Sequence, residues 1–113
     1  MEVYAKDKKM TKLLTNPVAL QKKYGAICGP KVMQRLNELR SAANLAEIAN
    51  LKSLQFHALR GDRAGEWSIK VHANNKMTFI RAIEPLVYLK DGSIDLSAVT
   101  AVEIVDPCVD YHK

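Results

Sequence analysis

The sequence predicts an α+β fold, in which an N-terminal helical hairpin packs on a twisted, mainly antiparallel sheet of four to five strands. Apolar residues recur at helical spacings in the first half of the chain, and at a spacing of two from Leu54 onward. Short loops join the segments of the second half, which favours antiparallel pairing. We expect one domain over residues 1–113, with a helical part at about 6–52, a sheet part at about 54–106 and a functional tail at 107–113.

Residues that start and stop helices mark the beginning of the chain. After a short opening strand at 3–5, Asn16 before Pro17 predicts a helix start, with Asn16 as the N-cap and Pro17 in the first helical position. Gly25 is expected to end this helix directly after Tyr24.

The second predicted helix begins at 29–30 and has two chemically different faces. Its apolar residues lie between Val32 and Ala43 at helical spacings. A break near Asn44 precedes a short third helical piece at 45–51. The polar face of the second helix is expected to turn its cations to solvent: Lys31, Arg35 and Arg40.

The second half of the chain alternates apolar and polar residues, as strands do when one face covers a core and the other is open. Trp67 follows a glycine-rich turn and is expected to face the core. Asn74-Asn75 predicts a tight turn, because asparagine tolerates a positive φ. Residues 85–93 are typical of a hairpin or an elaborated loop. The alternating segments are 56–59, 67–72, 77–79 and 102–105.

The positive charge is concentrated in the helical half. The net charge is +5, and residues 1–40 contain nine lysines and arginines against three acidic residues, so the whole basic excess lies there. This distribution is expected of a protein held against a polyanion by one face. A lysine-rich helix surface that only keeps the protein in solution has the same composition. Charge alone therefore does not separate RNA, DNA and ribosome from no partner.

Composition also sets the expected compartment and cofactors. The chain has no run of about 18 uncharged apolar residues, and its lysine-rich start lacks the apolar stretch of a secretory signal. We expect a cytoplasmic protein that does not bind a membrane. Cys28 and Cys108 are expected to be free thiols. The histidines and cysteines lack the spacing of a metal site, so neither a metal nor another cofactor is expected.

Acid–base groups occur on the first predicted strand and at the chain end. His57 should face the open side of the sheet, because its neighbours Phe56 and Ala58 point into the core. The last four residues are Asp110, Tyr111, His112 and Lys113, and the first three are acid–base groups that bury little apolar surface. Two imidazoles beside a phosphodiester can act as base and acid for attack by the ribose 2′-hydroxyl, with no metal required. Taken alone, however, such residues are typical of a surface histidine and a frayed terminus.

Phosphoryl transfer also needs positive charge near the phosphate oxygens. Arg60 and Lys76 are the candidates, with Arg60 as an electrostatic clamp, because a guanidinium stays protonated and cannot be a base. Arg63 follows Gly61-Asp62, and its favoured role is to lock this turn through the neighbouring carboxylate, with phosphate contact as its second role. Without the neighbouring motif, the favoured interpretation of Arg60 is a surface partner of Asp62.

Two segments together resemble the HigB branch of the RelE/ParE superfamily of bacterial toxins. The first is Leu-Arg-Gly-Asp-Arg-Ala-Gly-Glu-Trp-Ser-Ile at 59–69, and the second is the terminal Asp-Tyr-His at 110–112. The resemblance is close over 56–83 and 102–112. It implies a RelE-like fold and the toxin of a type II toxin–antitoxin system. Such a toxin is an RNA-binding mRNA interferase: a ribosome-dependent, metal-independent endoribonuclease that inhibits translation. Its implied partners are ribosome, mRNA and a HigA-like helix-turn-helix antitoxin, which alone contacts operator DNA.

Carried over one position at a time, the resemblance implies catalytic roles for His57, Asp110, Tyr111 and His112. It implies substrate binding by Arg60, Arg63 and Lys76. Arg60 stands where the family commonly has lysine, and Lys76 stands where it has arginine; the aromatic residue before that arginine is Asn75 here. The chain is also longer than is usual, with extra residues at about 84–100. The alternative is a ParE-like inhibitor of DNA gyrase with the same fold and no nuclease activity, although such relatives lack the terminal histidine arrangement.

Overall fold

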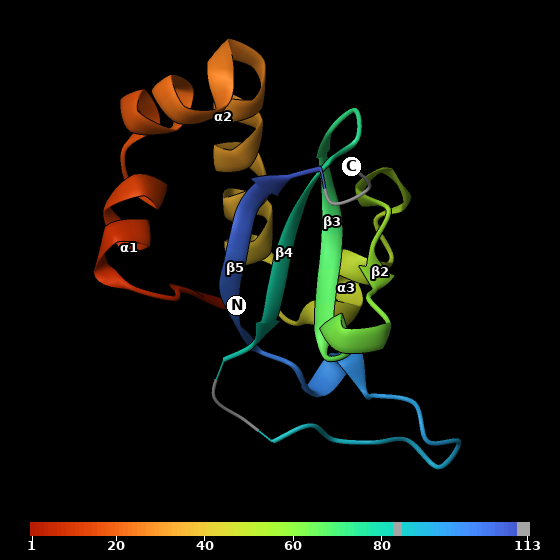
Figure 1. Ribbon diagram of the computed structural model, residues 1–113. Coiled ribbons are helices and arrows are strands. Elements are labelled where there is room, and N and C mark those ends of the chain that lie inside the picture. The colour runs from red at the N-terminus through yellow and green to blue at the C-terminus, as the bar shows by residue number, and fades with distance from the viewer. Residues whose placement is uncertain (83–84, 111–113) are drawn as a thin grey trace.

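The computed structural model describes residues 1–82 and 85–110, and its helices and strands follow the predicted α+β order (Figure 1). The five strands form a single sheet in the order β1-β5-β4-β3-β2. The helices are α1 (Lys8–Leu14), α2 (Pro17–Ser41) and α3 (Leu45–Ala49), and the strands are β1 (Glu2–Ala5), β2 (His57–Ala58), β3 (Glu66–His72), β4 (Asn75–Arg81) and β5 (Ala101–Val109). Three short 3₁₀ helices are η1 (Lys52–Leu54), η2 (Gly61–Arg63) and η3 (Leu96–Ala98).

The sheet is mixed, because its first and last strands pair in parallel. β1 lies beside β5 with Glu2 opposite Ala101, whereas the other three pairings are antiparallel. In Figure 1, α2 and α3 lie behind the sheet, and α1 lies outside β5. The predicted fold class, with its mainly antiparallel sheet of four to five strands, is confirmed and agrees with the fold that the resemblance implies. No helix within the described ranges has the length and apolar character needed to cross a membrane.

The helical hairpin is made by a break inside α2. The Asn16 side chain caps the helix by accepting from the backbone N–H of Ala19, as predicted from Asn16-Pro17. Gly25 has φ 97° and ψ 172°, which interrupts the helix at the predicted position. The helical run resumes directly after Gly25, so the predicted restart at 29–30 is too late. Pro30 instead lies about one turn into the second arm, close enough to its start to be tolerated.

Gly29 is the point where the two arms of α2 touch. A Cβ atom at Gly29 would lie 2.7 Å from the Cα of Gln21, a backbone atom that cannot rotate away. We expect Gly29→Ala to lower the free energy of unfolding by about 1–2 kcal/mol, because the arms must separate. Urea unfolding measures this, with Gln34→Ala at an exposed position of the second arm as the control. Equal stability of the two variants would contradict the close approach.

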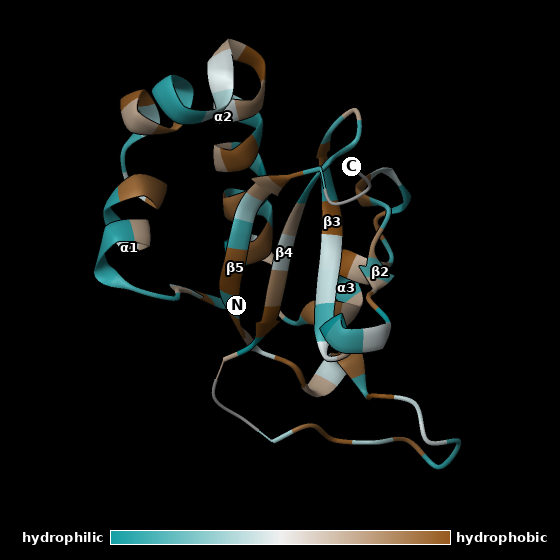
Figure 2. Ribbon diagram, in the orientation of Figure 1, coloured by the Kyte–Doolittle hydropathy of each residue, from teal (hydrophilic) through white to brown (hydrophobic). Residues whose placement is uncertain are grey.

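The core lies between the sheet and the second arm of α2, with α3 closing one end. Trp67 is buried as predicted, with its ring between those of Phe56 and Phe79, at centroid distances of 6.4 Å and 6.1 Å. In Figure 2 hydrophobic segments alternate with hydrophilic ones along the strands and along the helices behind them. The largest fully buried side chains include Leu20, Leu36, Leu39, Leu45, Ile48, Leu54, Ile69, Met77, Phe79 and Ile104.

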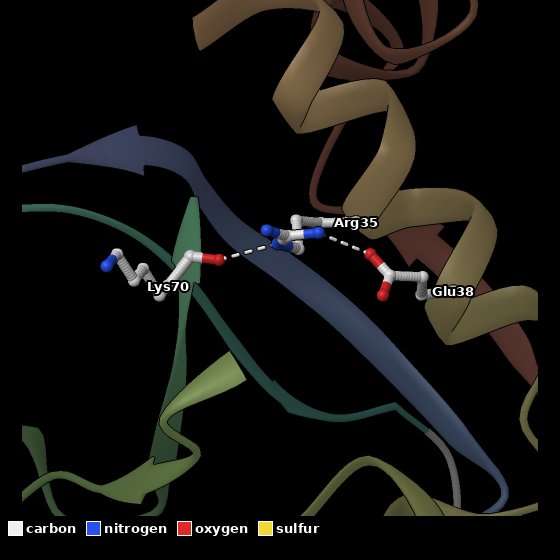
Figure 3. A network of polar contacts seen from close by, with 3 residues as sticks. All are labelled: Arg35, Glu38 and Lys70. Atoms are coloured by element: carbon white, nitrogen blue, oxygen red, sulfur yellow. Dashed lines mark hydrogen bonds and ion pairs between the residues drawn. The ribbon is translucent and has the colours of Figure 1, made fainter. Parts of the chain in front are cut away.

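Arg35 corrects the predicted polar face of the second helix. Lys31 is half-buried and Arg40 is exposed, but only 9% of Arg35 is exposed. Its Nε donates to the backbone oxygen of Lys70 at 2.7 Å, and its Nη1 lies 2.5 Å from Oε1 of Glu38 (Figure 3). The register between β3 and β4 shifts after Lys70, so the Lys70 carbonyl lies at an irregularity of this strand pairing. The Arg35 guanidinium, which comes from α2, supplies the hydrogen bond to this carbonyl. The expectation that Arg35 faces solvent is therefore wrong.

The turn between β3 and β4 consists of Ala73 and Asn74, one residue earlier than predicted. Ala73, not an asparagine, has the positive φ of 53°. We expect Ala73→Gly to raise the free energy of unfolding by about 0.5 kcal/mol, because glycine adopts this conformation without strain. Thermal unfolding provides the measurement. Ala64→Gly is the matched control, because Ala64 has φ −56° and should lose stability from the same substitution. A loss of stability in both variants would contradict the prediction.

The segment between β4 and β5 forms the hairpin that residues 85–93 predict. Tyr88 bridges to Ile94, the N–H of Leu89 donates to the Ser93 oxygen, and Gly92 has φ 87°. In Figure 1 this segment extends away from the end of the sheet at which β4 finishes. It lies between the last two strands in sequence and leaves the pairing of β4 with β5 intact.

β5 runs three residues beyond the predicted end of the sheet at 106 and contains Pro107. β1 ends opposite Ile104, so the following part of β5 is an edge on that side. The pairing with β4 shifts register twice in this region. A proline has no N–H to donate, and it is tolerated at such edges and bulges. Residues 107–109 therefore belong to the strand.

Candidate active site

Four polar residues form a row across the sheet face that points away from the helices. His57 of β2 is opposite Ser68 of β3, Ser68 is opposite Thr78 of β4, and Thr78 is opposite Asp106 of β5. Cross-strand partners project to the same face, and neighbouring strands are about 4.8 Å apart. The row therefore spans about 14 Å between its outer strands.

His57 occupies the outer strand of this row. Phe56 is directed inward, where its ring packs near Trp67, and the alternation of strand side chains then directs His57 to the other face. His57 is exposed, as the sequence predicts. β2 has only two residues and lies at the edge of the sheet. An imidazole here is accessible to a large substrate approaching from outside.

The middle of this face is not open, which corrects the prediction of a solvent-exposed polar side. Ser68 is 1% exposed and Thr78 is 0% exposed. Both are short side chains between rows of longer ones. Those neighbouring rows consist of Lys70 with Lys76, and Glu66 with Ile80.

Thr78 has an unused hydrogen-bonding group. Among the described residues, its buried Oγ1 has no hydrogen-bond partner. A buried hydroxyl without a partner costs about 1–3 kcal/mol. The centre of the row therefore contains a hydroxyl group that forms no hydrogen bond with the neighbouring strands.

Lys76 brings a positive charge toward the His57 side of the sheet. Its backbone lies on β4, opposite Lys70 of β3 and Val109 of β5. Its Nζ lies 3.3 Å from Oε1 of Gln55, which precedes β2. The ammonium thus reaches across β3 to a residue two positions before His57. Nothing in the sequence pattern indicated this role of Gln55.

The two arginines of the glycine-rich turn lie at the opposite end of β2. Arg60 is exposed and directly precedes η2. Arg63 forms an ion pair with Glu66 at 2.9 Å. This contact fixes the turn to the start of β3, in line with the structural role favoured for Arg63, although Glu66 was not the predicted partner. His57 lies between Arg60 and Lys76 along the sheet.

Asp110 is the last residue that the structure describes. It directly follows Val109, which pairs with Lys76. Tyr111 and His112 lie outside the described residues. The structure thus holds the Lys76 ammonium against Gln55, two residues before His57 in the chain, and it places Asp110 directly after the strand position that pairs with Lys76. No group of three metal-ligating side chains is found in the part of the chain that is described.

Comparison with known proteins finds a local similarity. No protein-family model matches the chain. The chain is 39% identical over 49 residues to "Endoribonuclease HigB" of Proteus vulgaris. These residues make up 43% of this chain and 52% of that protein, so the chain spans about half the length of this curated relative. Over that stretch, the similarity supports the resemblance to the HigB branch that the motifs predict.

Proposed function

We propose that the protein is the toxin of a type II toxin–antitoxin module and cuts messenger RNA on the ribosome, which inhibits translation. The observation that carries this proposal is the exposed His57 on the edge of the sheet, with the Lys76 ammonium held by Gln55 on one side and Arg60 on the other. The local similarity to an endoribonuclease supports it. A HigA-like antitoxin would neutralise the toxin and contact operator DNA in its place.

The proposed reaction is an intramolecular transfer of the phosphoryl group from the 5′-oxygen of one nucleotide to the 2′-oxygen of the preceding ribose. The ribose 2′-oxygen attacks the adjacent phosphorus, and the bond from phosphorus to the 5′-oxygen of the next nucleotide breaks. One imidazole takes the proton of the 2′-hydroxyl, and another gives a proton to the leaving 5′-oxygen. We assign these two roles to His57 and His112. The products are a cyclic 2′,3′-phosphate and a free 5′-hydroxyl, and no metal takes part.

Charge stabilisation comes from the cations on either side of His57. The transition state has more negative charge on the phosphate oxygens than the substrate has, and preorganised cations bind that charge without reorganisation. Arg60 and Lys76 have this role in the proposal, with Arg63 holding the turn that presents Arg60. Asp110 orients an imidazole, and Tyr111 stacks on a base or donates a proton.

The test is to map new 5′ ends on a message in a translating extract supplied with the protein. We expect cuts within the translated region that carry 5′-hydroxyl groups, so that they can be ligated only after treatment with a polynucleotide kinase. A chelator cannot be used to test whether the cleavage needs a metal, because removing Mg²⁺ would also dissociate the ribosomes. The chemical nature of the new ends is therefore the readout. The same message without ribosomes should stay intact. Intact messages at saturating protein would refute the proposal, and gyrase-dependent DNA breaks under those conditions would indicate the ParE-like alternative.

A further inference from the structure

The two cysteines, which lie far apart in the sequence, are neighbours in the fold. Cys28 lies in the second arm of α2, and Cys108 lies near the end of β5. The Cys28 thiol lies close enough to Cys108 to raise the pKa of the Cys108 thiol. The Asn75 amide at the start of β4 also donates to Sγ of Cys28 at 3.8 Å, which fixes the thiol against this end of the sheet. Both cysteines are partly buried and free.

We propose that Cys28 and Cys108 form a dithiol site of oxidative modification, which small-molecule disulfides convert to an intramolecular disulfide. Such a bond would tie α2 to the end of β5, two residues before Asp110. Asn75, which binds the Cys28 sulfur, directly precedes Lys76, and Lys76 pairs with Val109, the residue after Cys108. Helix α2 and the end of β5 therefore hold both thiols at the same end of the sheet. This inference does not depend on whether the protein cuts RNA.

The reaction with glutathione disulfide proceeds in two exchanges. The thiolate of one cysteine attacks one sulfur of the glutathione disulfide, forming a mixed disulfide and releasing one glutathione thiolate. The thiolate of the other cysteine then attacks the protein sulfur of the mixed disulfide and releases the second glutathione. Each cysteine loses one proton and each released glutathione gains one, so the protein dithiol is oxidised and one glutathione disulfide is reduced to two glutathiones.

The environment of Cys108 slows this exchange. Burial, and then the neighbouring Cys28, raise the pKa of Cys108 to about 12, so its thiolate is scarce at neutral pH. We therefore expect the disulfide to form faster as the pH is raised.

The test is to equilibrate the folded protein with graded ratios of glutathione disulfide to glutathione and to measure its intact mass. The chain has two cysteines, so a monomer that has lost two hydrogen atoms contains the Cys28–Cys108 bond. We expect this species to dominate. We expect its equilibrium constant to be about tenfold or more larger in the folded protein than in concentrated urea, because folding brings the thiols together. The oxidised protein should unfold at a temperature roughly 10 °C higher than the reduced one.

Cys28→Ser and Cys108→Ser are the controls, since each keeps one thiol. Neither should lose two hydrogen atoms within a monomer, and glutathione disulfide should not raise the unfolding temperature of either. Equal equilibrium constants in folded and unfolded protein would overturn the proposal. Glutathione adducts or linked dimers as the main products of the folded protein would overturn it too.

Discussion

Replacing His57 by glutamine is expected to lower the rate of message cleavage by about 100-fold or more, which is the usual contribution of a general acid or base. Glutamine keeps a hydrogen-bonding side chain of similar reach, but it cannot accept and return a proton near neutral pH. His57 is exposed on an edge strand, so the substitution removes no core contact. The change should therefore act on the reaction and leave the fold intact.

The measurement is the single-turnover rate at which 5′-hydroxyl ends appear in the translating extract. His72→Gln is the matched control, because His72 is also an exposed histidine on the sheet. It lies at the last position of β3, at the opposite end of that strand from the Arg60–Arg63 turn. This variant should cut within about twofold of the unchanged protein, and both variants should unfold at the same temperature. A similar loss in both, or full activity of His57→Gln, would remove His57 from the mechanism.

The variant with both His57→Gln and His112→Gln should cut no more slowly than the worse single variant. Two groups that transfer protons for one bond act as a unit, so removing the second has little further effect. Losses that multiply would show that the two histidines act on separate steps.

Replacing Arg35 by methionine is expected to lower the free energy of unfolding by about 2–3 kcal/mol. The long apolar side chain keeps much of the packing, but the Lys70 carbonyl loses its donor and Glu38 loses its cation. The Glu38 side chain is 31% exposed, and water can replace part of that ion pair. Most of the loss should therefore come from the carbonyl at the irregularity of β3.

Urea unfolding measures this effect, provided that the dependence of the free energy of unfolding on urea concentration is the same for the variant and the unchanged protein. Arg40→Met makes the same substitution at an exposed position of α2 and should change stability by less than about 0.5 kcal/mol. Glu38→Gln removes only the ion pair and should cost less than Arg35→Met. Equal losses from Arg35→Met and Arg40→Met would show that the contact with Lys70 contributes nothing.

Local sequence signals predicted the elements of this fold well, because their causes are local. Asn16-Pro17 and Gly25 mark the start of α2 and its break, and the change of period near Leu54 marks the passage to the sheet. The burial of Arg35 could not be predicted from such local signals. Its burial depends on a carbonyl at an irregularity of β3, which is distant in sequence. A helical period alone places Arg35 on the polar face.

In the candidate site too, features with a local cause could be predicted, and features that depend on the packing of distant segments could not. Alternation about Phe56 is enough to direct His57 away from the core. The contact of Lys76 with Gln55 and the burial of Ser68 and Thr78 both depend on which strands are neighbours. That order is a property of the whole sheet, and no short stretch of sequence contains it. The parts of the site at Tyr111 and His112 stay predictions.

The parallel pairing of β1 with β5 controls when this molecule can acquire its shape during synthesis. β5 is translated after every other strand, yet it lies between β1 and β4 and supplies Asp106 to the polar row. A nascent chain that has not yet extruded β5 has an unpaired first strand and an unfinished sheet. Pairing between strands so distant in sequence is also slow to form. The polar face is therefore assembled only after translation of β5.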